Sequence, residues 1–94
     1  MNILVELGGI SRVLTGVREV PLEVADDTTF RDILAILGTR YPVLIGQVIQ
    51  PEGPALFASN MLNLNGRHML REDQLDESPQ DGDLILLMSV LAGG

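Results

Sequence analysis

Cysteine, lysine and tryptophan are all absent from this sequence of 94 residues. Without cysteine the chain has no disulfides, no thiolate metal sites, no iron–sulfur clusters and no cysteine nucleophile, and it gives no sign of an oxidising compartment. Aromatic residues make up only 3% of the sequence. Leucine, isoleucine and valine must therefore fill most of a single core, as expected for one domain spanning residues 1–94.

Positive charge is also scarce, because six arginines face thirteen acidic residues and the formal net charge is −7. Binding to nucleic acid needs clustered positive side chains, so we expect no nucleic-acid partner. The acidic balance favours encounter with a basic protein surface. No stretch approaches the ~18 apolar residues of a membrane span, and the first residues lack the basic start of a signal peptide. We expect no membrane partner and a cytoplasmic location.

The first quarter of the chain predicts two strands. Alternation over residues 2–7 places Ile3, Val5 and Leu7 on a buried face, with Leu4 as an apolar exception on the other face. We expect a connection over residues 10–16, with Val13 and Leu14 at the edge of the core. Residues 17–24 alternate again. Pro21 cannot donate to a strand ladder and predicts a position at the edge of the sheet.

One amphipathic helix follows a start signal at residues 26–29, where a threonine hydroxyl can cap free N–H groups. Its apolar stripe has helical spacing and consists of Phe30, Ile33, Leu34, Leu37 and Tyr41. Pro42 predicts the end of this helix. The apolar residues 43–49 fit either a second short helix or a buried loop, and residues 50–54 form a turn or loop.

The second half predicts three further strands. Residues 55–64 resemble a strand, and Asn65-Gly66 is a strong signal for a hairpin that returns through residues 67–70. Residues 71–79 form an acidic connection with Leu75 as its core anchor, and residues 80–83 turn into the last strand. Together these elements predict one compact α+β domain.

The last strand is apolar on both of its faces. Leu84, Leu86, Met88 and Val90 alternate with Ile85, Leu87 and Leu91. If this strand is central and a single helix covers one face of the sheet, its other face lies open to a partner. Which face is open does not follow from the sequence. The candidate partner-binding residues are Leu84, Leu86, Met88, Val90 and Leu91.

Residues 91–94 predict a thin, flexible tail. Glycine permits close approach to another surface, so Ala92, Gly93 and Gly94 could enter a narrow slot. The reactive group we expect there is the α-carboxylate of Gly94.

Other candidate sites are weaker. His68 has no second histidine or cysteine to complete a metal site, and an exposed strand residue is the simpler interpretation. The carboxylates of residues 72–83 lack the spacing of a calcium loop and favour a solvated acidic surface. We therefore expect no metal site and no bound cofactor. No nucleophile–base pair can be assembled, so we expect a protein that is not itself an enzyme.

Taken in order, several motifs resemble the β-grasp sulfur carriers, the family of the molybdopterin synthase small subunit and the thiamine sulfur carrier. The motifs are Glu19-Val20-Pro21-Leu22-Glu23, Thr29-Phe30-Arg31-Asp32-Ile33-Leu34, Tyr41-Pro42, Leu64-Asn65-Gly66-Arg67, Asp81-Gly82-Asp83 and Gly93-Gly94. The resemblance covers nearly the whole chain and is closer to the molybdopterin branch. Residues 87–91 stand where that branch commonly carries an aromatic-Pro-Pro segment. The resemblance implies a ubiquitin-like β-grasp fold, a mixed sheet with one main helix packed on one face.

The resemblance also implies a mechanism that other proteins perform on this one. A ubiquitin-activating-type adenylating enzyme would use ATP and Mg²⁺ to convert the Gly94 carboxylate to an acyl-adenylate. Sulfur from a persulfide would then replace AMP and leave a thiocarboxylate, a better nucleophile than a carboxylate. The second implied partner is the molybdopterin synthase large subunit.

We therefore expect a sulfur carrier for molybdopterin synthesis, in the molybdenum or tungsten cofactor pathway. Two alternatives share its activated terminus: a ubiquitin-like modifier joined through Gly94 to lysines of target proteins, and a sulfur carrier of the thiamine pathway. A fourth hypothesis is a β-grasp interaction module whose tail has no function.

Overall fold

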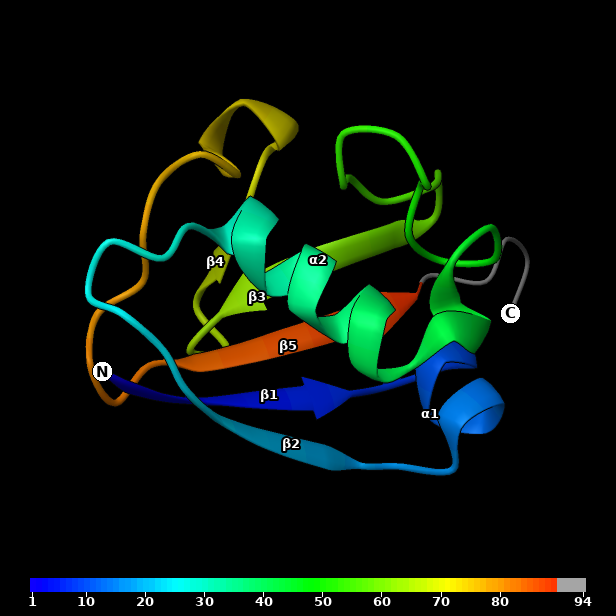
Figure 1. Ribbon diagram of the computed structural model, residues 1–94, viewed down its shortest axis with the longest axis horizontal. Coiled ribbons are helices and arrows are strands. Elements are labelled where there is room, and N and C mark those ends of the chain that lie inside the picture. The colour runs from blue at the N-terminus through cyan, green and yellow to red at the C-terminus, as the bar shows by residue number, and fades with distance from the viewer. Residues whose placement is uncertain (90–94) are drawn as a thin grey trace.

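The computed structural model describes residues 1–89, and these residues form one mixed sheet of five strands (Figure 1). The strands are β1 (Asn2–Leu7), β2 (Glu19–Glu23), β3 (Asn60–Leu64), β4 (His68–Met69) and β5 (Leu84–Ser89). The helices are α1 (Ile10–Thr15) and α2 (Phe30–Arg40), with short 3₁₀ helices at Pro42–Leu44 and Glu72–Gln74. One main helix, α2, lies across one face of the sheet, as the sequence predicts.

The strand order is β2-β1-β5-β3-β4, so the last strand in sequence is the middle strand of the sheet. Strand β5 runs parallel to β1, with Val5 opposite Ile85, and antiparallel to β3, with Leu62 opposite Leu87. Strand β2 lies at an edge, which confirms the position predicted from Pro21. A proline is tolerated there because no outer strand needs its missing N–H group.

Helix α2 begins at a capping box. The Thr29 hydroxyl accepts a hydrogen bond from the Asp32 N–H at 3.1 Å, and the Asp32 carboxylate accepts one from the Thr29 N–H at 3.0 Å. Two of the free N–H groups at the helix start are thereby satisfied. Phe30, Ile33, Leu34 and Leu37 are buried, and Tyr41 packs half-buried at the helix end. The predicted apolar stripe is confirmed.

The connection after α2 covers the rest of the same sheet face. It combines both structures that the sequence left open, since Pro42–Leu44 is a 3₁₀ helix and the loop that follows is exposed at residues 45–47 and buried at Val48 and Ile49. Leu44, Val48, Ile49 and Ala55 are buried in the core. The core therefore lies between one face of the sheet and a layer made of α2 and this loop.

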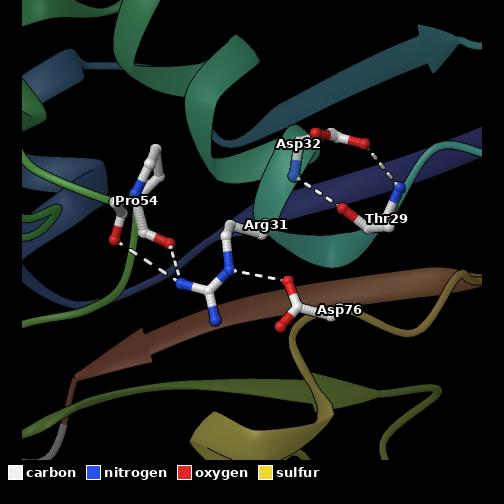
Figure 2. A network of polar contacts seen from close by, with 6 residues as sticks. Thr29, Arg31, Asp32, Pro54 and Asp76 are labelled. Carbon is white, nitrogen blue, oxygen red and sulfur yellow. Dashed lines mark hydrogen bonds and ion pairs between the residues drawn. The ribbon is translucent and has the colours of Figure 1, made fainter.

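Arg31, on the first turn of α2, ties two other segments to the helix (Figure 2). Its Nε donates to Asp76 Oδ1 at 2.8 Å, and its guanidinium also donates to the Pro54 carbonyl at 2.8 Å. The Arg31 N–H donates to the Leu75 carbonyl at 2.8 Å, beside the buried side chain of Leu75. The predicted core anchor of the acidic connection is confirmed.

The predicted hairpin is present between β3 and β4. Asn65 and Gly66 both have positive φ angles, 58° and 71°, as a type I′ turn requires. The Asn65 side chain also reaches the start of β5, because its Nδ2 donates to Asp83 Oδ1 at 3.0 Å and its Oδ1 accepts from the Leu84 N–H at 2.8 Å. The turn thus fixes the entry into the central strand.

Two predictions were wrong. Val13, which was expected at the edge of the core, is 77% exposed because it lies on the outer side of helix α1, while Leu14 contacts the core as expected. The strand predicted over residues 55–64 begins only at Asn60. The chain turns at Ser59, whose φ is 73°, so the residues before it belong to the loop that follows α2.

Candidate functional site

The two faces of β5 have different surroundings. Ile85 and Leu87 are 0% exposed beneath the helical layer, whereas Leu84 and Leu86 are half-buried and Met88 is 39% exposed on the opposite face. This answers the question that the sequence left open. The face of Leu84, Leu86 and Met88 is the one that α2 does not cover.

Neighbouring strands extend this apolar surface. Residues directly opposite each other on paired strands share a face of the sheet. Leu4 lies opposite Leu84, Met61 lies opposite Met88, and Asn63 lies opposite both Leu86 and Met69. We name the resulting surface the open-face patch. It consists of Leu4, Met61, Met69, Leu84, Leu86 and Met88.

Part of the open-face patch could have been found from the sequence. Leu4 broke the alternation of its strand, and an apolar residue on the outer face of a strand is a signal for a surface of this kind. Met61 and Met69 gave no such signal. Their positions depend on the register of β3 against β5 and β4, which is set by contacts between distant parts of the chain.

The carboxyl end of β5 is held against the start of α1. The Gly8 N–H donates to the Leu87 carbonyl at 2.8 Å, and Ser89 Oγ accepts a hydrogen bond from the Ile10 N–H at 3.1 Å. Gly9 has φ 58°, and a Cβ added to it would lie 1.9 Å from Ser89 Oγ. Glycine is therefore required where this loop meets the central strand. No local spacing of residues indicates this contact, because it joins segments 79 residues apart.

A shallow cleft of ≈ 250 Å³ lies beside the same end of the sheet, lined among others by Glu6, Arg12, Arg18, Leu86 and Met88. Within the described residues, Arg12 and Arg18 form no ion pair with a carboxylate. The apolar end of β5 is thus bordered by two positive side chains in an otherwise acidic protein.

Val90, Leu91, Ala92, Gly93 and Gly94 lie outside the described residues. This holds for the predicted tail, for the reactive carboxylate and for two of the candidate partner-binding residues. The structure places the other three, Leu84, Leu86 and Met88, on one surface.

Four of the six carboxylates of residues 72–83 have structural partners. Asp81 accepts from the Asn2 N–H at 2.6 Å, Asp83 accepts from the Gln80 N–H at 2.8 Å, and Asp73 pairs with Arg71 at 3.1 Å. The hydrogen bond to Asp76 raises the pKa of Arg31 further above its usual value. His68 is exposed, as expected, on a two-residue strand.

Two further features concern only residues 1–89. In this part of the chain, no three histidine, cysteine or acidic side chains lie close enough together to hold a metal ion. Neither helix of the same part has the length and apolar character needed to cross a membrane.

Comparison with known proteins places these features in a family. The model of the ThiS family matches residues 5–94. The chain belongs to the ThiS family. This family consists of small sulfur carriers and ubiquitin-like proteins, so the resemblance seen in the sequence is confirmed.

Relatives of this ThiS-family chain include small archaeal modifier protein 3 of Haloferax volcanii, which is 31% identical over 83 residues and 88% of each chain. The crystal structure of SAMP1 from Haloferax volcanii superposes with a TM-score of 0.82 at 26% identity over 100% of both chains. Subunit 1 in the complex of subunits 1 and 2 of the molybdopterin-converting factor from Helicobacter pylori gives a TM-score of 0.63 at 19% identity, over 100% of both chains. The last likeness concerns the fold alone. The expected ubiquitin-like β-grasp fold is confirmed.

Proposed function

We propose that this protein is a sulfur carrier whose Gly94 carboxylate is adenylated and then converted to a thiocarboxylate. The observation that carries the proposal is the family match over residues 5–94, which includes the terminal Gly93 and Gly94. A carboxylate is a poor electrophile until its oxygen becomes part of a good leaving group, and AMP is such a group. The carrier supplies the terminus, and a ubiquitin-activating-type enzyme supplies ATP, Mg²⁺ and the catalytic groups.

The open-face patch is the docking surface for that activating enzyme in this proposal. Strand β5 carries Leu84, Leu86 and Met88 and leads directly into residues 90–94. An enzyme that holds the patch therefore holds the strand from which the tail extends. Five residues in a fully extended chain span at most about 18 Å. The reacting carboxylate can therefore lie up to about this distance from the docked surface.

In this proposal the sulfur is transferred to the molybdopterin precursor. The transfer takes place while the carrier is bound to a synthase large subunit. Support comes from the likeness in fold to subunit 1 of the Helicobacter pylori complex, which that protein forms with subunit 2. The length and the Tyr41-Pro42 helix end favour the same branch over the shorter thiamine carriers.

The experiment measures the intact mass of the protein after incubation with ATP, Mg²⁺, a persulfide donor, a thiol that cleaves the resulting acyl disulfide, and the activating enzyme from the same cell. We expect the gain in mass that corresponds to replacement of one oxygen by sulfur. A variant lacking Gly94 should keep its fold, since every buried residue named above precedes position 90, and should show no gain. The proposal would be contradicted if the mass of the native protein stayed unchanged while the same enzyme modified another carrier. The untreated mass also tests whether Gly94 is the terminal residue in the cell.

A second function, protein modification through Gly94, is favoured by the similarity to small archaeal modifier protein 3. Both functions begin with the same acyl-adenylate, so activation alone does not separate them. Conjugates of higher mass that survive thiol treatment and disappear with the Gly94 deletion would indicate modification. The absence of lysine excludes lysine-linked chains of this protein on itself.

A further inference from the structure

Every methionine after the first residue lies in the open-face patch. The chain has four methionines, of which Met1 packs against the core. Met61 lies opposite Met88 on the neighbouring strand, and Met69 lies opposite Asn63, two residues along β3 from Met61. Since the chain has no cysteine, the patch also holds the protein's most accessible oxidisable sulfur atoms.

These thioethers are reachable from solvent. Met69 is 43% exposed and Met88 is 39% exposed, while Met61 is half-buried between its neighbours. Side chains directly opposite on antiparallel strands have Cβ atoms about 4.5–5.5 Å apart, so Met61 and Met88 form one contiguous surface. An oxidant that reaches Met88 also reaches the centre of the patch.

The chemistry is simple and reversible. A sulfur lone pair of methionine attacks one oxygen of hydrogen peroxide, the O–O bond breaks, and the products are a sulfoxide and water. The sulfur loses two electrons and the peroxide gains them. A reductase restores the thioether at the expense of two thiols, which become a disulfide as water is released. The sulfoxide is polar, whereas the thioether is apolar.

We propose that Met61, Met69 and Met88 form an oxidation-sensitive cluster, and that their sulfoxidation by peroxide releases the open-face patch from the activating enzyme. The inference rests on the proposed function, because it regulates the docking surface assigned there. A sulfoxide oxygen buried against an apolar partner surface loses its hydrogen bonds to water. Loss of binding follows from this unpaired polar group.

The fold tolerates the same oxidation. Leu62, Ile85 and Leu87 hold β3 and β5 to the core from the opposite face of the sheet and are buried. The sulfur atoms of the cluster lie on the face that α2 leaves open, so added oxygen atoms project away from the core. Oxidation therefore acts on docking and not on folding.

The test oxidises the carrier alone with hydrogen peroxide, removes the peroxide with catalase and then titrates the activating enzyme by calorimetry. Peptide mass mapping assigns the added oxygen atoms. We expect Met69 and Met88 to oxidise before Met61, and the oxidised protein to bind roughly tenfold or more weakly, the loss expected for one unpaired buried polar group. Treatment with a methionine sulfoxide reductase should restore the affinity.

Leucine variants provide the matched control, because they keep an apolar side chain of similar size without sulfur. The affinity of the triple variant M61L/M69L/M88L for the enzyme should be the same before and after peroxide treatment. Met88→Gln, which places a polar group in the same position, should bind weakly without any oxidant. Equal loss of binding by the peroxide-treated triple variant, or full binding by the oxidised native protein, would overturn the proposal.

One comparison separates this inference from the proposed function. Before oxidation the native protein must both bind the enzyme and gain sulfur at Gly94. Binding without sulfur gain contradicts the carrier function and leaves the oxidation test valid. Sulfur gain with affinity insensitive to methionine oxidation contradicts only the inference.

Discussion

Asp32 shows how one side chain near a helix start acquires a pH-dependent role. Its carboxylate accepts a hydrogen bond from the Thr29 N–H at 3.0 Å. Hydrogen bonding to the Thr29 backbone, and then to its side chain, lowers the pKa of Asp32 below the usual 3.8. A carboxyl group whose pKa is lower in the folded state stabilises that state at pH values above its unfolded pKa. This contribution is lost as the pH falls through the lower, folded pKa.

We therefore expect Asp32→Asn to be less stable than the native protein at neutral pH, and the difference to shrink as the pH falls below about 4. Urea unfolding at a series of pH values between about 6 and 2 measures this difference. Glu52→Gln is the control, because among the described residues its side chain forms no ion pair. A difference that stays constant down to the lowest pH would contradict the assigned role of the Asp32 carboxylate.

At the scale of elements, the contact between α1 and β5 decides where the chain leaves the sheet. Gly9 precedes α1 and Ser89 ends β5, and Ser89 Oγ accepts from the Ile10 N–H. The N-terminal loop thereby constrains the last described residue of the central strand. Because residues 90–94 follow directly, this contact sets the starting point of the tail.

Two glycines differ in both backbone conformation and steric contact. Gly16 has the left-handed helical conformation (φ 70°, ψ 9°) and a Cβ there meets nothing within 4 Å, whereas Gly9 has φ 58° and ψ −133°, a conformation that favours glycine more strongly. We expect Gly16→Ala to cost about 1 kcal/mol for its backbone conformation. Gly9→Ala should cost about 1–2 kcal/mol more, because its backbone conformation is less accessible to alanine and because its Cβ displaces Ser89.

Denaturant unfolding of both alanine variants measures these costs. In the proposed carrier function, Gly9→Ala should also slow the gain of sulfur at Gly94 at equal enzyme concentration, since it displaces Ser89, which residues 90–94 follow directly. Equal stability of the two variants would contradict the larger cost expected at Gly9.

On the scale of the whole molecule, the layered arrangement places one face of β5 in the core and leaves its other face at the surface. The helical layer covers Ile85 and Leu87, and the opposite face leaves an apolar patch on a chain of net charge −7. An exposed apolar patch on an otherwise charged surface is typical of a docking site. The negative net charge of the chain favours approach to a basic partner, with an association rate that falls as salt is added.

Met88→Asp should therefore weaken binding to the activating enzyme by roughly tenfold or more, because it places a charge in a desolvated contact. Val13→Asp is the matched control, since Val13 is an exposed apolar residue on α1 outside the open-face patch. Calorimetric titration of both variants against the same enzyme measures the effect. Equal weakening by the two variants would indicate a general charge effect in place of a specific surface.

Local patterns in the sequence determined much of this architecture. Helix α2 follows from the spacing of Phe30, Ile33, Leu34 and Leu37, since each turn places these residues on one side. The hairpin follows from Asn65-Gly66, because few other pairs accept two positive φ angles. The edge position of β2 follows from the missing donor of Pro21. These features depend on a few neighbouring residues.

Only the tertiary structure decided which surface is free. Periodicity showed that β5 is apolar on both faces, but it carried no information on which face α2 would cover. That choice depends on strand order and register, which join residues as distant as Leu4 and Leu84. The open-face patch, the methionine cluster and the contact of Gly9 with Ser89 all arise from such pairings. They form between segments far apart in the chain, so the local spacing of residues does not indicate them.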